Sequence, residues 1–380
     1  MEKKRVDPFG GAQTTSFRTL KKARRRVNPE QTPALRQGSR RVDFGHLFLI
    51  FYVMLITMLI GGCAAPKVTA PQVMVPRFEA KSFPNFVAVI AQEGNTLSTL
   101  AERYLNDPSM DWFIAEYNDI STLHPGQALI IPLKPYEKGG LTLKGYQTVP
   151  VLNYHNFSLD RSTNRMIVTK AAFEEQMKLL KDKGYRVITL NQLLNFLEFK
   201  GQIPKKSVVI TIDDGWRSTY DIALPILKKY GYPATLFIYT DLIVGSKKTL
   251  SWELIQEMVK DGIDLQGHTK THRILTLMDR KESFREYFGT IEKELLESAR
   301  IIKAKTGKDV KYLAYPDGET NHLVIELVKK YGYLGAFTVK RGGNPFFIHS
   351  YRINRSMVYG DSDLNQFEKN LAVFSDEALK

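Results

Sequence analysis

The chain has 380 residues, of which 43% are hydrophobic and 11% aromatic, so it can form two or three packed units. Its net charge of +14 is typical of a nucleic-acid-binding protein, but the charge is unevenly distributed. Residues 1–43 hold 12 Lys/Arg and 4 Asp/Glu, a net of +8, whereas the remainder holds 42 and 36, a net of +6. A basic segment before an apolar one is the positive-inside pattern, so the charge indicates membrane topology and argues against nucleic acid as a partner.

A charge-free apolar segment, residues 44–63, follows the basic head and ends at the only cysteine, Cys63. The small residues before Cys63 resemble those of a bacterial lipoprotein signal, which implies that this cysteine is lipidated. The segment also has about the 20 residues that a helix needs to cross a bilayer, so an uncleaved anchor is the alternative. Both interpretations predict a membrane-tethered, extracytoplasmic protein of the bacterial cell envelope that has no second cysteine for a disulfide.

Four prolines in residues 64–85 predict an extended linker. Residues 86–134 then predict a compact unit that begins and ends with a strand and contains two helices. The expected elements are a strand at Phe86–Ile90, a helix capped by Asn95 or Thr96 and running to Tyr104, a helix at Asp111–Tyr117, and a strand before Pro132.

The segments EGNTLSTLAERY, WFIAEYN and HPGQALIIP of this unit resemble a LysM domain, although Asn95 stands where the family usually has Asp. The resemblance implies a β-α-α-β module that binds GlcNAc-containing glycans, such as peptidoglycan or chitin, in a shallow groove. A spacer that has lost glycan binding is the alternative interpretation.

Residues 147–380 alternate between strand-like and helix-like segments. The strand-like segments are 149–154, 207–212, 234–238, 263–266, 312–315 and 334–338, and the helix-like segments are 170–183, 222–230, 253–259, 281–306 and 321–331. This alternation predicts an α/β fold with a parallel sheet, either a barrel or doubly wound. An apolar stripe from Phe284 to Ile302 is expected to pack in the core.

Two of these strands end in side chains that suit metal chemistry. Asp213 and Asp214 end one strand, and His268 and His272, four residues apart, follow another. An Asp pair alone could be a helix cap, and two His residues at this spacing can arise by chance. Because active sites of parallel α/β folds lie at the C-terminal ends of strands, the two segments are expected to meet. Together they could hold one divalent metal and leave a carboxylate free for proton transfer.

The order of TIDDG, PATLF, HTKTH and AYPDG resembles the polysaccharide deacetylase family, also called NodB-homology domains. The resemblance implies a distorted, incomplete (β/α) barrel that hydrolyses N- or O-acetyl groups with a bound metal, usually Zn²⁺. It assigns Asp214, His268 and His272 to the metal and Asp213 to the general base. The oxyanion would be held by a backbone N–H after Pro316, that of Asp317.

Two positions depart from the common pattern of that family. Ala314 stands where an arginine often orients the base, and we expect Arg355 to take that role. No segment matches the motif that supplies the general acid, so His349 and His155 are the candidates.

The sequence therefore predicts a tethered, metal-dependent N-deacetylase of a GlcNAc-containing polysaccharide. Tyr315 and Trp216 could line the sugar site, although packing roles are equally expected. The LysM resemblance favours peptidoglycan as the substrate. The opening VLNYH resembles deacetylases of poly-N-acetylglucosamine and, together with Ala314, favours that polymer. A catalytically silent glycan-binding scaffold is the alternative, but a scaffold has no need of a metal-and-base set.

Overall fold

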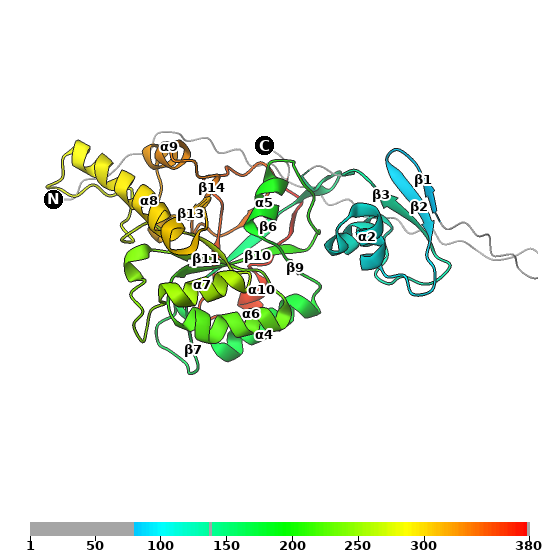
Figure 1. Cartoon of the computed structure of the whole chain (residues 1–380), viewed down its shortest axis with the longest axis horizontal. Helices are drawn as coiled ribbons and strands as arrows, with labels where there is room; N and C mark the ends of the chain where they lie inside the picture. Colours follow the sequence, from blue (N-terminus) through cyan, green and yellow to red (C-terminus); the bar gives the residue numbers. More distant parts are fainter. Residues whose placement is uncertain (1–79, 137–138, 378–380) are drawn as a thin grey trace, which may run out of the picture. The chain divides into compact units, whose positions relative to one another are not determined.

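A computed structural model of the chain describes residues 80–136 and 139–377. The basic head, the apolar segment 44–63, Cys63 and most of the linker 64–85 lie outside these residues. Within the described part of the chain, no helix is both long enough and apolar enough to span a bilayer. Two bodies of structure follow, a small N-terminal module and a large α/β domain (Figure 1).

The N-terminal module, residues 80–133, has its own apolar core, which includes Val87, Leu100, Ile114 and Ile131. Its elements are β1 (Ala80–Ser82), β2 (Phe86–Ile90), α2 (Leu97–Leu105), α3 (Asp111–Tyr117) and β3 (Ala128–Pro132). Strand β2 lies between β1 and β3 and is antiparallel to both. The order of β2, α2, α3 and β3 matches the predicted strand–helix–helix–strand order, whereas β1 is an additional strand within the predicted linker 64–85. Thr96 rather than Asn95 caps α2 by accepting a hydrogen bond from the Thr99 N–H.

The large domain is built on a parallel sheet in the order β14-β13-β12-β11-β10-β6. These strands are β6 (Val149–Tyr154), β10 (Ser207–Asp214), β11 (Thr235–Ile238), β12 (Asp264–Gly267), β13 (Tyr312–Ala314) and β14 (Gly335–Phe337). Each corresponds to a strand expected from the sequence. Since all six are parallel, their carboxyl ends lie at the same edge of the sheet.

The sheet is curled into an incomplete barrel. Ile353 forms a parallel bridge with Phe337 of β14, and β16 (Ser356–Met357) pairs with β6. A single short segment, residues 353–357, therefore contacts strands at both ends of the parallel array. This arrangement agrees with the distorted, incomplete (β/α) barrel expected from the sequence.

Alternation along β10 separates the two faces of the sheet. Ile210 and Ile212 pack in the same core as α4 (Lys170–Asp182), α6 (Leu224–Tyr230) and α7 (Trp252–Lys260). Val209 instead packs with Phe237 and with α5 (Leu190–Leu197). Because successive side chains of a strand point to opposite faces, Thr211 and Asp213 share the side of Val209.

The helices cover the sheet in two groups. In Figure 1, α4, α6 and α7 lie together beside β10 and β11, while α8 (Phe284–Thr306) and α9 (His322–Lys330) lie near β13 and β14. The remaining elements are β4 (Leu141–Thr142), β5 (Gly145–Gln147), β7 (Asn156–Ser158), β8 (Ile167–Thr169), β9 (Arg186–Val187), β15 (Gly343–Asn344), α10 (Leu364–Glu368) and β17 (Phe374–Ser375).

One helix differs from its prediction in a way that matters for the site. Helix α8 begins at Phe284 and not at residue 281, because Ser283 and Glu286 form a capping box there. Phe284 is 62% exposed, so its expected core position was wrong, and Tyr287 is buried in its place. The buried side of α8 also includes one carboxylate, that of Glu294.

Candidate active site

The carboxyl ends of β10 and β12 bring one carboxylate and two imidazoles together. The Nε2 atoms of His268 and His272 are 3.1 Å apart, and Asp214 Oδ1 lies 3.9 Å from the first and 3.8 Å from the second. In the tetrahedral zinc sites of proteins, bonds of about 2.0–2.2 Å place the ligand atoms roughly 3–4 Å apart. The residues present therefore fit a divalent metal such as zinc.

The environment of His268 prepares its ring to be a ligand. The ring is 2% exposed, and its Nδ1 donates a hydrogen bond of 2.7 Å to the Ala314 carbonyl oxygen. This bond leaves the Nε2 lone pair facing His272 and Asp214. Burial lowers the pKa of His268 from its ordinary value, although the carboxylates of Asp213 and Asp214 oppose that shift. The imidazole is consequently neutral at neutral pH, which is the state that binds a metal.

Trp216 orients the carboxylate of Asp214. Asp214 Oδ1 faces the two histidines, while Oδ2 accepts a hydrogen bond of 2.8 Å from Trp216 Nε1. The backbone of Asp214 has φ 80°, a left-handed conformation that turns the chain sharply at the end of β10. The sequence allows Trp216 to line the sugar site or to pack, and the structure places its indole N–H against this carboxylate.

The histidine loop, residues 268–272, is anchored by a buried carboxylate from α8. Thr269 and His272 have φ of 71° and 67°, so the loop adopts left-handed backbone at two non-glycine positions. Glu294, 4% exposed, accepts hydrogen bonds from the N–H groups of Lys270 and Thr271, both 2.8 Å, and from Thr271 Oγ1, 2.7 Å. Glu294 therefore stabilises the strained loop that presents both imidazoles.

Asp213 is a buried carboxylate that accepts three hydrogen bonds from side chains. Arg355 donates from Nη1 to Oδ1 at 2.7 Å and from Nη2 to Oδ2 at 2.8 Å, and Asn153 Nδ2 donates to Oδ2 at 3.1 Å. Burial by itself would raise the pKa of Asp213, but Arg355, with His268 and His155 nearby, outweighs burial and holds that pKa well below its ordinary value. Asp213 is thus ionised, and its Oδ2 lies 4.0 Å from His268 Nε2.

Arg355 reaches Asp213 from the segment that joins the two ends of the parallel array. Its side chain is fully buried, and its Nε donates to the Thr338 carbonyl oxygen at 3.0 Å. The guanidinium also lies over the ring of Phe237, 5.5 Å from the centroid. Ala314, where the sequence lacks an arginine, is also fully buried, so Arg355 is the arginine that bonds to Asp213.

The two candidate acids lie in different places. His155 directly follows β6 and is near enough to lower the pKa of Asp213. His349 is exposed, and its Nδ1 accepts a hydrogen bond from the Tyr351 N–H at 3.1 Å. The next residue, Ser350, bonds through its carbonyl to the N–H of Ala336, in β14. The structure brings His155 near Asp213 and does not bring His349 to it.

The turn after β13 contains the other two residues singled out in the sequence. Tyr315 is fully buried and donates its hydroxyl to the Tyr351 carbonyl oxygen at 3.1 Å, so it packs in the core and presents no face to a sugar. Asp317 is exposed and has φ 56°. The hydrogen bond from His268 to Ala314 fixes the start of this turn beside the three potential metal ligands.

Residues 200–336 match the polysaccharide deacetylase family. The poly-β-1,6-N-acetyl-D-glucosamine N-deacetylase of Staphylococcus aureus (strain MRSA252) is 31% identical over 241 residues, which cover 60% of this chain and 82% of the relative. The crystal structure of BC0361, a polysaccharide deacetylase from Bacillus cereus, has a TM-score of 0.51 and 28% identity over 67% of this chain and 74% of that one.

The fold is also that of the Streptococcus pyogenes deacetylase PplD in complex with acetate, with a TM-score of 0.54 and 24% identity over 60% of this chain and 99% of that one. The match to residues 200–336 includes the Asp pair, both histidines and the turn after β13. The curled sheet, the site at its carboxyl edge and these similarities lead to one conclusion. The chain belongs to the polysaccharide deacetylase family.

Proposed function

We propose that this protein is a metal-dependent hydrolase that removes N-acetyl groups from a GlcNAc-containing polysaccharide of the cell envelope. The observation that carries the proposal is the ionised Asp213, held by Arg355, next to the converging ligand atoms of Asp214, His268 and His272. A glycan-binding scaffold would gain nothing from a buried charge beside three potential ligands, since burying charges is costly.

In this proposal Asp214, His268 and His272 hold one divalent ion, for which zinc suits the nitrogen and oxygen ligands. When bound, the ion supplies Lewis-acid polarisation of the acetyl oxygen and of the attacking water. Asp213 accepts the proton of that water. Because the low pKa of Asp213 makes it a weak base, it can do so only when the water is made more acidic by its surroundings.

Two further groups complete the reaction. The backbone N–H of Asp317 stabilises the oxyanion of the tetrahedral intermediate. The hydrogen bond from His268 to the Ala314 carbonyl oxygen supports this role, since it holds the start of the turn that contains Asp317 beside the histidine. His155 protonates the departing amine, since an amide nitrogen does not leave as an anion. Its position after β6, within electrostatic reach of Asp213, supports this role over His349.

The substrate is proposed to be peptidoglycan or a poly-N-acetylglucosamine. The name of the Staphylococcus aureus relative favours the second polymer. The N-terminal module favours the first, because its sequence segments and its strand–helix–helix–strand order fit a LysM domain. A glycan-binding module next to the enzyme raises the local concentration of an insoluble substrate. A lipid on Cys63, or an anchor at residues 44–63, would hold the protein on the membrane.

The test is acetate release from peptidoglycan and from poly-N-acetylglucosamine, with and without chelator, for the wild type and for Asp213→Asn. The proposal predicts chelator-sensitive release that the substitution abolishes, and the better polymer identifies the substrate. Thermal melting of Asp213→Asn is the control for folding, because the substitution leaves Arg355 without its charge partner. No acetate and no bound metal would instead favour the scaffold.

A further inference from the structure

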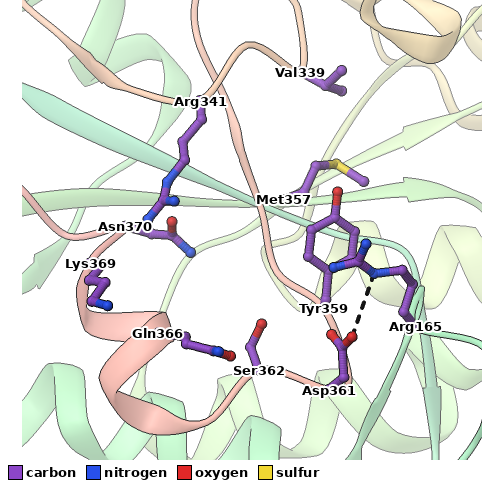
Figure 2. A pocket seen from close by; sticks show the side chains of 10 residues that line it. All are labelled: Arg165, Val339, Arg341, Met357, Tyr359, Asp361, Ser362, Gln366, Lys369 and Asn370. Atoms are coloured by element: carbon purple, nitrogen blue, oxygen red, sulfur yellow. Dashed lines mark ion pairs between the residues drawn. The ribbon is translucent and has the colours of Figure 1, made fainter.

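A cavity of about 430 Å³ lies beside the site and has no part in the chemistry above (Figure 2). Two of its lining residues also contact the site. Met357 Sδ lies 3.2 Å from Asn153 Nδ2, the amide that donates to Asp213. Val339 packs against the turn after β13, since a Cβ on Gly318 would lie 2.5 Å from it. Two side chains in contact, Met357 and Asn153, therefore connect the cavity to the carboxylate of Asp213.

Basic side chains converge on this cavity from three separate segments. Arg165 comes from the loop before β8, Arg341 from the loop after β14, and Lys369 from the end of α10. Asp361, the one acidic residue of the lining, lies 3.7 Å from Arg165 Nε. Figure 2 shows Arg341 and Lys369 on the opposite side of the cavity from this ion pair, with Asn370 near the guanidinium.

Two of the three cations have no protein partner among the described residues. Within residues 80–136 and 139–377, neither the Arg341 guanidinium nor the Lys369 ammonium makes a hydrogen bond or an ion pair. The neighbouring side chains of Gln366, Asn370 and Ser362 add further hydrogen-bond donors to the lining. A single exposed lysine needs no explanation, but two unpaired cations with three donors in one concavity match a ligand with concentrated negative charge.

The wall that faces these cations is held by ring stacking and by backbone contacts. The Arg165 guanidinium stacks on the ring of Tyr359 with its carbon 3.8 Å from the centroid. Behind it, the Gly360 N–H donates to the Arg165 carbonyl oxygen at 2.7 Å. A Cβ on Gly360 would lie only 1.9 Å from the Ile167 carbonyl oxygen, so the two segments are packed backbone to backbone. The cavity thus has packed segments, those of Arg165 and Tyr359, on one side and the unpaired cations Arg341 and Lys369 on the other.

We propose that this cavity is a subsite for an anionic group, a carboxylate or a phosphate ester, carried by the glycan on a sugar next to the one that loses its acetyl group. The inference rests on the proposed deacetylase function. It selects an anionic N-acetylated glycan as the substrate class, over a neutral polymer. It also disfavours glycan already deacetylated at the neighbouring sugar, because a protonated amine would meet Arg341 and Lys369.

The experiment compares three N-acetylated tetrasaccharides with the full-length protein: neutral chitotetraose, a GlcNAc–MurNAc tetrasaccharide that carries carboxylates, and chitotetraose 1-phosphate. The test variant is Arg341→Gln/Lys369→Gln. The matched control, Lys293→Gln/Arg300→Gln, removes the same charge from exposed positions of α8. All four positions are exposed, so neither variant should unfold the chain.

The expected result is a KM for at least one anionic substrate that rises about tenfold in the test variant, while its kcat stays within twofold. Chitotetraose and the control variant should show no change. Whether the carboxylate or the phosphate substrate responds identifies the anion. Equal changes for neutral and anionic substrates, or no change for any, would overturn the subsite. A wild-type protein that releases acetate from none of the three would instead count against the proposed function.

Discussion

The site depends on a pair of opposite charges, Asp213 and Arg355, both of which are buried. Asp213 is 1% exposed and Arg355 is fully buried, and they share two hydrogen bonds of 2.7 and 2.8 Å. Taking two charges out of water is costly, and the bidentate geometry offsets much of that cost. Removing one partner leaves the other as an uncompensated buried charge, so the pair is stable only as a unit.

Arg355→Met should destabilise the fold by about 3–5 kcal/mol in urea unfolding, because Asp213 then lacks its partner. The double variant Arg355→Met/Asp213→Asn should be more stable than Arg355→Met, since it removes both charges. If the loss in free energy of unfolding of the double variant equals the sum of the losses of the two single variants, the two charges do not act as a unit.

The same substitution should move the pH dependence of the reaction. Asp213 keeps a pKa well below its ordinary value because Arg355 outweighs burial. Without the arginine, burial raises the pKa of the carboxyl group, and Asp213 takes up a proton at higher pH. The acid limb of the kcat/KM profile of Arg355→Met should therefore shift to higher pH. An unchanged acid limb would show that Arg355 does not control the pKa of Asp213.

Trp216→Phe should weaken metal binding about tenfold, because Asp214 loses the donor that orients its carboxylate. Competition with a chromophoric chelator measures the affinity without relying on activity. Trp252→Phe is the matched control, since Trp252 is also half-buried but packs in α7, in the helical layer. Equal losses in both variants would indicate a general packing effect.

The sequence identifies the residues of the site that lie at strand ends, and it misses the bond of Trp216 to Asp214 and that of Glu294 to the histidine loop. Asp213, Asp214, His268 and His272 stand in recognisable segments. Arg355 is 142 residues from Asp213 in the sequence. It could be predicted only because Ala314 stands where an arginine usually orients this carboxylate. The bond from Trp216 to Asp214 depends on a left-handed turn, which apolar periodicity does not reveal.

At the scale of elements, helix α8 supports the histidine loop through Glu294. Glu294 lies between Ile291 and Leu295 on the buried side of the helix, where periodicity predicts only an apolar residue. Most strands of the parallel sheet were easier to predict, because they are short buried apolar runs, although β12 combines Leu265 with polar residues. Helix α5 was missed, although Thr189 and Gln192 form a capping box at its start.

Glu294→Gln should lower metal affinity about tenfold and destabilise the fold by about 1–3 kcal/mol, because an amide nitrogen cannot accept the hydrogen bonds of the loop. The measurements are chelator competition and urea unfolding. Glu297→Gln, on the same helix, is the control, because among the described residues Glu297 makes no hydrogen bond to the loop. Unchanged metal affinity in Glu294→Gln would show that the loop holds its shape without this carboxylate.

The chain as a whole combines a small module that has its own core with a domain of the polysaccharide deacetylase family. A chain that begins at residue 134 should release acetate from a soluble oligosaccharide as fast as one that begins at residue 76. On insoluble polymer it should be several-fold slower, because the module no longer concentrates the enzyme on the glycan. Equal rates on the insoluble polymer would assign the module a spacer role.

Asp213 is proposed to act beside a metal held by Asp214, His268 and His272. This role is tested by acetate release from protein that has been stripped of metal and then titrated with Zn²⁺, for the wild type and for Asp213→Asn. We expect wild-type activity to return and to saturate near one equivalent of zinc. We also expect that Asp213→Asn still binds about one equivalent but stays inactive. Full activity of the stripped protein, or an active Asp213→Asn variant, would contradict this role.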